Sequence, residues 1–210
     1  MPGIENFIEL EPNSLNKELV LFMEQTLPSF QASQEFIDIL EHKKNENQHS
    51  LSFCVFMTNE CHSKFYFARE NAQKGSSVID IGVYRGSVLI FTIEAKLLPT
   101  PKGSKKKLRD EHEYVYGKGA GIQRFKEESH GLDNGGNLLL ENGLIAFIKN
   151  GDFAQWFKKV NEWILSAAWG EQEQLEEISF DSIGKLRSKH IRINNSQVIL
   201  YHFWIDVSTT

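Results

Sequence analysis

The chain has 210 residues, of which 40% are hydrophobic and 24% charged, and this is the composition of an ordinary globular protein. No stretch reaches the roughly 18 apolar residues of a membrane-spanning helix, so we expect no membrane contact. The net charge of −5 disfavours a protein that coats nucleic acid through bulk electrostatic attraction.

The first 45 residues are expected to form an N-terminal helical extension, 1–45. Residues 1–5 lack a basic region followed by an apolar stretch, so we expect no signal peptide and a cytoplasmic location. Apolar residues at helical spacing predict a helix over 13–27, which Pro28 is expected to end. A second helix is predicted over 33–43.

The rest of the chain, 46–210, is expected to form one domain. A helix is predicted over 46–61; the residues expected to face the core are Leu51, Cys54, Val55 and Thr58. Three strands are expected to follow, over 65–68, 77–84 and 88–97. The two cysteines, Cys54 and Cys61, are expected to be free thiols.

The second half of the domain predicts further alternation of helices and strands. The expected elements are a short helix over about 121–129, a strand at 144–148, an amphipathic helix that Asp152 caps, and two strands at 189–194 and 197–207. The fold class is therefore α/β, with a mixed central sheet flanked by helices. His202 lies in an aromatic run and is expected to be a hydrogen-bonded residue of the core or sheet.

A basic loop separates the two halves. Five cations and no acid lie between 102 and 109, namely Lys102, Lys105, Lys106, Lys107 and Arg109. Such a loop can contact phosphates locally although the protein is acidic. The alternative is a solvated loop with no specific role.

Two acids lie within apolar, strand-like runs on either side of a turn signal. Asp80 interrupts the run 78–83, and Glu94 ends the run 89–94, two residues before Lys96. An acid in such a run is costly unless a metal, a partner charge or water compensates it. Hard oxygen ligands favour Mg²⁺ or Mn²⁺. The alternative is an exposed ion pair at a strand end.

The register of this hairpin decides whether the acids can meet. A three-residue connection over 85–87 pairs residue 84 with 88 and residue 80 with 92. Asp80, Glu94 and Lys96 then share one face, whereas a regular two-residue turn at 85–86 places the two acids on opposite faces. We therefore expect an odd-length connection or a bulge around 85–87, where Gly86 can adopt a left-handed conformation.

The run from 78 to 96 resembles the PD-(D/E)xK nuclease superfamily. Asp80 matches the first acid, Glu94 and Lys96 match the second acid and the lysine, and Ile79 stands where the family usually has proline. The resemblance covers about 46–150. It implies a restriction-endonuclease-like αβββαβ core, followed here by a C-terminal helix and a β-hairpin. It also implies a Mg²⁺-dependent deoxyribonuclease with DNA as its partner, acting in defence or repair.

The resemblance implies further site residues. Family members often carry a glutamate on the helix before the first strand, and Glu46 is preferred here over Glu60, about 21 Å further along the same helix. Gln123 and Arg124 match a polar or basic position on the following helix. Phosphate contacts are expected from the lysines Lys118, Lys105, Lys106 and Lys107.

A second interpretation remains open. The chain can instead be a catalytically silent nuclease-fold module that binds nucleic acid or a partner protein, which its acidic character favours. A third is a structural protein whose hairpin acids form a surface ion pair. The sequence leaves open the strandedness of the substrate, endonuclease against exonuclease action, and the oligomeric state, a homodimer included.

Overall fold

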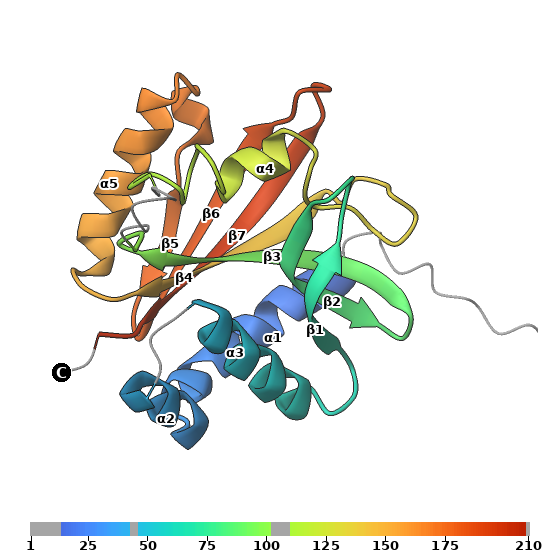
Figure 1. Cartoon of the computed structure of the whole chain (residues 1–210), viewed down its shortest axis with the longest axis vertical. Coiled ribbons are helices and arrows are strands. Elements are labelled where there is room, and N and C mark those ends of the chain that lie inside the picture. The colour runs from blue at the N-terminus through green and yellow to red at the C-terminus, as the bar shows by residue number, and fades with distance from the viewer. Residues whose placement is uncertain (1–13, 43–45, 102–109, 209–210) are drawn as a thin grey trace, which may run out of the picture.

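The computed structural model describes residues 14–42, 46–101 and 110–208, and in these ranges five α-helices surround a mixed sheet of seven strands (Figure 1). The helices are α1 (Ser14–Gln31), α2 (Gln34–His42), α3 (Glu46–Glu60), α4 (Ile122–Lys126) and α5 (Phe153–Ser166), with a 3₁₀ turn η1 (Glu171–Glu173). The strands are β1 (Tyr66–Ala72), β2 (Val78–Arg85), β3 (Val88–Leu98), β4 (Glu141–Ile148), β5 (Glu176–Phe180), β6 (Ile183–Ile191) and β7 (Gln197–Asp206). The predicted α/β class is confirmed.

The sheet has a parallel centre between two antiparallel flanks. Its strand order is β1-β2-β3-β4-β7-β6-β5. Strands β1, β2 and β3 form an antiparallel meander, β4 runs parallel to both β3 and β7, and β6 and β5 complete the sheet antiparallel. Every residue of β4 is buried, as expected of a strand whose two faces are both covered.

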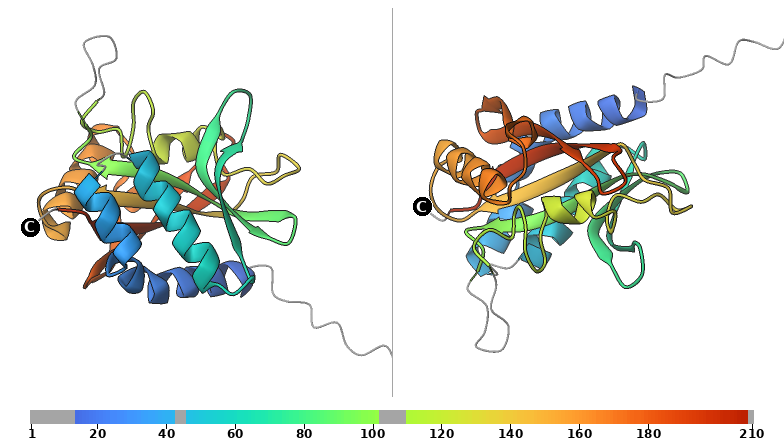
Figure 2. Two further views of the ribbon diagram at one scale, coloured as in Figure 1. Left: turned by 60° about the horizontal axis from the view of Figure 1, so that its bottom comes forward. Right: turned by 90° about the horizontal axis from the view of Figure 1, so that it is seen from above.

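Two hydrophobic cores cover the two faces of the sheet, and Figure 2 shows the helices on either side of it. On one face α1, α2 and α3 pack through residues such as Met23, Phe30 and Phe53 against the sheet. On the other face α5 packs through Trp156, Val160 and Ile164, which the amphipathic pattern places inward. Both cysteines are free and buried, and no helix in the described ranges is long and apolar enough to cross a bilayer.

Two predicted details of the helices are wrong. Helix α1 continues through Pro28 to Gln31, because Phe30 beyond the proline is fully buried in the core and its burial outweighs one lost backbone hydrogen bond. Helix α3 buries Cys54 as predicted, together with Phe53 and Met57, whereas the predicted Leu51 and Val55 are half exposed. Apolar residues surround this helix, so the pattern did not specify which face would be buried.

The C-terminal part differs from the predicted helix and hairpin. Strand β6 begins at Ile183, well before residue 189, and β5 adds a further strand that extends the sheet. In β6 the polar residues Lys185 and Arg187 alternate with buried ones, and β5 is an exposed edge strand. These short polar segments gave too weak a hydrophobic pattern to be recognised.

Candidate functional site

The hairpin between β2 and β3 differs from the predicted connection. The observed pairs are Arg85–Val88, Tyr84–Leu89, Val83–Phe91 and Ile81–Ile93. The turn therefore has two residues, with Gly86 at φ 59°, and Ile90 is an extra residue bulged out of β3. The predicted three-residue connection is wrong, while the bulge was expected near the turn and lies a few residues further along β3.

The bulge determines how the two acids meet. Continuing the observed register by one residue places Asp80 opposite Glu94, not opposite Thr92 as predicted. Both registers put the acids on one face, because they differ by two residues. The ladder between β2 and β3 stops at Ile81, and beyond it Asp80 Oδ2 accepts a hydrogen bond of 2.8 Å from the backbone N–H of Ala95.

Glu94 and Lys96 form a buried ion pair in the middle of β3. Lys96 Nζ lies 2.5 Å from Glu94 Oε1, and both residues are at most 5% exposed. Arg124, from α4, places Nη1 3.1 Å from the same oxygen. His130, in the loop after α4, places Nε2 3.3 Å from Glu94 Oε2. Arg124 and His130, which lie outside the β2–β3 hairpin, therefore both reach the Glu94 carboxylate.

Glu46 joins this site from the first turn of α3. Its Oε2 accepts a hydrogen bond of 3.1 Å from the backbone N–H of Leu97, and its charge acts on Lys96. Glu60 is exposed at the opposite end of the helix. We call Glu46, Asp80, Glu94 and Lys96 the acid cluster.

The acid cluster separates the pKa values of its two strand acids. Burial, and then the negative charge of Glu94, raise the pKa of Asp80 to about 7. Burial also acts to raise the pKa of Glu94, but the positive charge of Lys96 is the largest cause that opposes it, and the value is lowered to about 2. Burial opposes the charge of Lys96, yet the three surrounding carboxylates raise its pKa above the ordinary value. Lys96 and Glu94 are thus charged at neutral pH, while Asp80 is close to its titration point.

One oxygen of the acid cluster is left without a hydrogen bond. Nδ1 of His130 lies 2.8 Å from the carbonyl of Ser129, which can only accept, so Nδ1 carries a hydrogen. In the neutral ring Nε2 is then an acceptor, and Arg124 lies 3.1 Å away to donate to it. With a neutral His130 ring, whose Nε2 lies 3.3 Å away, Glu94 Oε2 makes no hydrogen bond to the described residues, although it is fully buried. Leaving a buried carboxylate oxygen unpaired is costly.

The cluster contains carboxylates, which are the ligands that small divalent cations prefer. Within 14–42, 46–101 and 110–208, no three His, Cys, Asp or Glu side chains converge into a complete metal cage. Mg²⁺, however, usually keeps several of its waters and needs only one or two carboxylates. The unpaired Oε2 of Glu94 and the raised pKa of Asp80 are both features that a nearby cation would relieve. Asp80 and Glu94 therefore fit Mg²⁺ or Mn²⁺.

The other predicted site residues are placed differently. Gln123 points away from the acids, since its amide accepts from Gly117 N and donates to Glu127. Arg124 reaches Glu94 instead. Lys118 is exposed in the loop before α4, and Lys105, Lys106 and Lys107 lie outside the described residues. His130 was missed, because no ligand spacing in the sequence indicates it.

A second buried polar chain runs between β6, β7 and the loop before α4. We call Tyr114, His202, Ser188, His190 and Glu173 the histidine chain. Its links are Tyr114 Oη to His202 Nδ1 at 2.7 Å, His202 Nε2 to Ser188 Oγ at 2.8 Å, Ser188 Oγ to His190 Nε2 at 2.7 Å, and His190 Nδ1 to Glu173 Oε2 at 2.9 Å. The prediction that His202 is a hydrogen-bonded core residue is confirmed.

Every link of the histidine chain can be satisfied at once. Trp204 donates to Tyr114 at the first end, and Lys126 donates to Glu173 at the other. A single direction of donation then satisfies the Tyr114 hydroxyl, both imidazoles and Ser188 without any charge on the rings, and burial accordingly lowers the pKa values of the two histidines. Ser188, His190 and Glu173 have the order of a hydrolase triad, but Ser188 is 1% exposed and cannot reach a substrate.

Comparisons with known proteins do not assign this chain to a family. No protein-family model matches the chain, and searches of curated proteins and of solved structures found no match either. A functional interpretation therefore depends on the chemistry of the acid cluster.

Proposed function

We propose that this protein is a metal-dependent nuclease that hydrolyses phosphodiester bonds in DNA. The observation that carries the proposal is the convergence of Glu46, Asp80, Glu94 and Lys96 from α3, β2 and β3, with one buried carboxylate oxygen unpaired. The element order α3-β1-β2-β3-α4-β4 also follows the αβββαβ order of a restriction-endonuclease-like core. This order supports the resemblance of the hairpin motif to PD-(D/E)xK nucleases.

The side chains of the cluster have distinct roles in this proposal. Asp80 and Glu94 would hold Mg²⁺ or Mn²⁺, which when bound stabilises the negative charge that develops on the phosphate. Lys96 stays protonated beside Glu94 and brings a fixed positive charge to the same place. Glu46, which bonds to the backbone next to Lys96, helps to keep the ammonium charged. Arg124 is one-third exposed and can reach a phosphate at the surface.

The proposal is tested by a cleavage assay with purified protein. Supercoiled, linear duplex and single-stranded DNA are incubated with Mg²⁺ or Mn²⁺, and EDTA should abolish cleavage. The variant Asp80→Asn should lose it, whereas Asp181→Asn, an exposed aspartate in the turn between β5 and β6, should cut like the parent. A parent protein that cuts none of these substrates with either metal contradicts the proposal.

A second candidate is a nuclease-fold module that binds DNA or a partner protein without cutting. One observation favours it: Glu94 Oε1 is already engaged by both Lys96 and Arg124, a structural arrangement that needs no metal. Isothermal titration with Mn²⁺ separates the two candidates. A silent module should bind no Mn²⁺, whereas the nuclease should bind it with an affinity that Asp80→Asn abolishes.

A further inference from the structure

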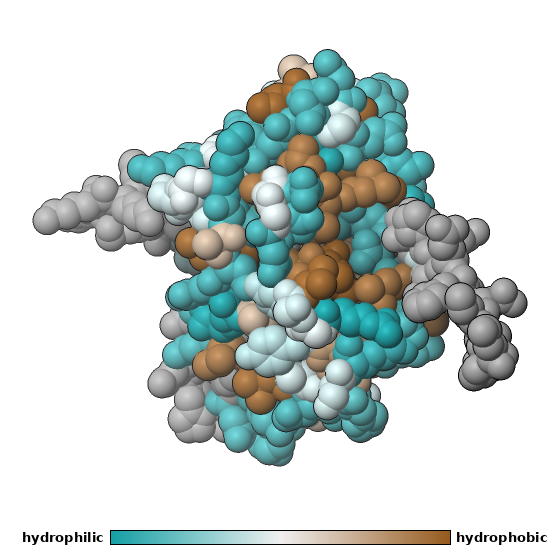
Figure 3. Space-filling model, turned by 90° about the vertical axis from the view of Figure 1, so that its right-hand side faces the viewer, coloured by the Kyte–Doolittle hydropathy of each residue, from teal (hydrophilic) through white to brown (hydrophobic). Residues whose placement is uncertain are grey.

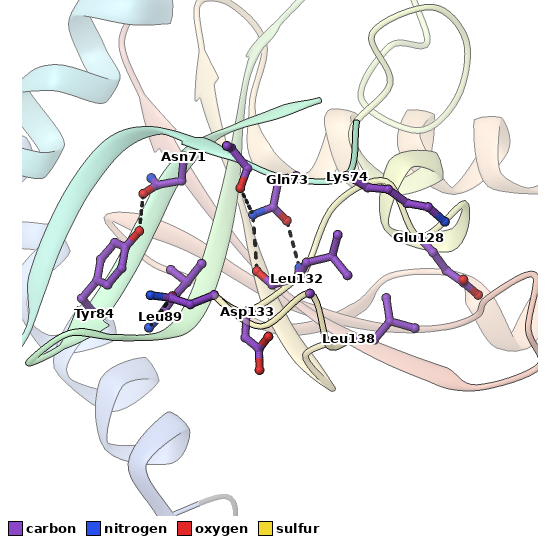
Figure 4. A pocket seen from close by; sticks show the side chains of 12 residues that line it. Asn71, Gln73, Lys74, Tyr84, Leu89, Glu128, Leu132, Asp133 and Leu138 are labelled. Atoms are coloured by element: carbon purple, nitrogen blue, oxygen red, sulfur yellow. Dashed lines mark hydrogen bonds between the residues drawn. The ribbon is translucent and has the colours of Figure 1, made fainter. Parts of the chain in front are cut away.

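A cleft of about 650 Å³ lies between the strands β1 to β3 and the loop 131–139 (Figure 4), and no residue of the acid cluster lines it. Its volume is within the range of pockets that bind small molecules. It belongs to the side of the molecule at the right of Figure 1, and Figure 3, which shows that side, has hydrophobic side chains gathered near the centre of a mostly hydrophilic surface. None of the residues to which the proposed function assigns a role lines this cleft.

The walls of the cleft are held in place by hydrogen bonds. Gln73, at the end of β1, accepts from Leu132 N at 2.9 Å and donates to Leu132 O at 3.3 Å. Asn134 accepts from Leu89 N at 3.0 Å and donates to Ser87 O at 3.1 Å. The loop 131–139 is thereby bonded to the end of β1 and to the start of β3. The cleft is therefore formed before a ligand binds, and little conformational entropy is lost in ordering it.

The lining combines a flat ring, apolar walls and side-chain amides, of which Asn71 lies beside the ring. The half-buried ring of Tyr84 faces a space lined by Leu89, Leu132 and Leu138. The amide of Asn71 donates to Ala68 O and accepts from the Tyr84 hydroxyl at 2.6 Å. A primary amide has two N–H groups and two lone pairs on its oxygen, so one donor and one acceptor remain.

Such a lining matches an unpaired nucleobase. Bases stack on aromatic side chains in single-strand binding proteins, and an asparagine amide can offer a base edge one donor and one acceptor together. The charges of the lining disfavour a phosphate, because it contains one cation, Lys74, and two acids, Glu128 and Asp133. An uncharged base is therefore a better occupant than the phosphate attached to it.

The cleft lies on the same face of β2 as the acid cluster. Asp80, Gly82 and Tyr84 alternate along that strand, so Asp80 and Tyr84 are separated by about 13 Å. Gly82, between them, leaves the space that the Asn71 amide fills, since a Cβ there would come within 2.7 Å of the amide. One strand of nucleic acid can thus reach both places, with a base in the cleft and its backbone continuing towards the acids.

We infer that this cleft receives one unpaired nucleobase of the DNA strand whose backbone lies at the acid cluster, and that it selects single-stranded or locally unpaired DNA. The inference rests on the proposed nuclease function for the identity of the ligand. It deepens that function by assigning the substrate class and by naming Tyr84 and Asn71 as specificity residues. Tyr84 supplies the stacking surface, and Asn71 reads the base edge.

The test measures binding separately from cleavage. Fluorescence anisotropy of labelled oligo-dA, oligo-dC, oligo-dT and a blunt duplex is followed with the full chain in EDTA, so that no DNA is cut. Tyr84→Ala should weaken single-strand binding about tenfold, the usual scale for losing one stacked base. Tyr84→Phe should keep most of the affinity but change the preference among the three oligonucleotides, because Asn71 loses its hydroxyl partner. Leu51→Ala, an exposed residue of α3 that lines a different groove, is the control and should bind like the parent.

A second variant protects the test against misfolding. Leu138→Glu changes a half-buried wall residue of the loop and should also weaken single-strand binding, with thermal melting used to verify the fold. The inference is overturned if Tyr84→Ala and Leu138→Glu both bind single strands as tightly as the parent does. It is also overturned if the parent binds no single strand or prefers the duplex. A parent that binds single strands through Tyr84 but never cuts them leaves the cleft supported and the nuclease proposal refuted. If the parent cuts DNA and Tyr84→Ala cuts it at the same rate, the nuclease proposal is supported and the role of the cleft is refuted.

Discussion

The two buried polar regions of this protein are built from similar side chains but are completed to different degrees. In the histidine chain each link from Trp204 to Lys126 has its donor and its acceptor. In the acid cluster Glu94 Oε2 makes no hydrogen bond to the described residues, and the pKa of Asp80 is raised to about 7. A completed network stabilises and specifies a core, whereas an incomplete one lowers stability.

The contrast indicates that the histidine chain serves the stability of the fold, whereas the acid cluster is suited to binding a ligand. Nothing more has to bind for the histidine chain to be stable, although it contains the order Ser188, His190, Glu173. The acid cluster would be stabilised by the cation that we propose beside Glu94 and Asp80. Local departures from the rules of stable folding are expected at functional sites. Resemblance to a catalytic triad is therefore weaker evidence of function than a buried polar group that makes no hydrogen bond.

The largest expected effect is that of Lys96→Met. This change leaves the Glu94 carboxylate buried with one fewer counter-charge, and removing one partner of a buried pair typically costs about 3–5 kcal/mol. The free energy of unfolding, measured in urea, should fall by that amount, and cleavage should fall at least about a hundredfold. The double variant Glu94→Gln/Lys96→Met should be more stable than Lys96→Met alone. Equal stability of the two would contradict a buried pair.

The variant Asp80→Asn separates activity from stability. We expect cleavage to fall at least about a hundredfold, the scale for losing a preorganised charged group, while the metal-free protein becomes more stable at pH 8. The gain is expected because the raised pKa shows that ionised Asp80 is unfavourable in the fold, and Asn can still accept from Ala95 N. Parallel loss of activity and of melting temperature would instead indicate a structural acid.

The buried strands of the sheet could be predicted from the sequence, whereas its edge strand and the path of helix α1 could not. The hairpin and the strand that contains Leu144 to Ile148 were predictable because long apolar runs fill both sides of a buried strand. Strand β5 was not predictable, since an exposed edge strand carries little apolar pattern. The path of α1 through Pro28 depends on the tertiary burial of Phe30, which no local signal contains.

The candidate site was predictable where its residues are close in sequence. Asp80, Glu94 and Lys96 lie on one hairpin, and parity along a strand limited the registers that could bring them together. His130 and Arg124 reach Glu94 from outside the hairpin, through the fold of the segment around α4. The exact register depended on a bulge in β3, which packing of the sheet fixes and the turn residues do not.

Breaking the histidine chain should affect stability without affecting activity. Ser188→Ala removes the acceptor of His202 and the donor to His190 in a buried place, so the unfolding free energy should fall by about 1–3 kcal/mol. Cleavage by the folded variant should equal that of the parent. Ser182→Ala, an exposed serine in the turn before β6, is the control and should change neither quantity. A loss of cleavage in folded Ser188→Ala would mean that the two polar regions are coupled.

The pH dependence of stability should have opposite signs in the two regions. Because the pKa of Asp80 is raised to about 7 in the fold, the metal-free folded state retains a proton that the unfolded state loses above about pH 4. Asp80 therefore makes stability fall between about pH 4 and 7, by up to about 1.4 kcal/mol per pH unit. The lowered pKa values of His190 and His202 make stability fall as pH drops below about 6.5. Urea unfolding of the parent and of Asp80→Asn at several pH values tests this. The difference between their unfolding free energies should change between about pH 4 and 7, and it should stay constant there if Asp80 has an ordinary pKa.

The smallest expected effect concerns the exposed Lys118, which extends the comparison to the surface beside the acid cluster. It lies in the loop before α4, whose Arg124 reaches Glu94, so a phosphate at the cluster has this lysine within the same segment of the chain. Lys118→Ala should weaken DNA binding a few-fold, independently of base sequence, and lower the slope of log K against log salt by about 1. Lys17→Ala, on α1 across the sheet, is the control and should leave the slope unchanged. Equal decreases in both variants would show that DNA responds to the overall charge of the protein and not to a surface centred on the acid cluster.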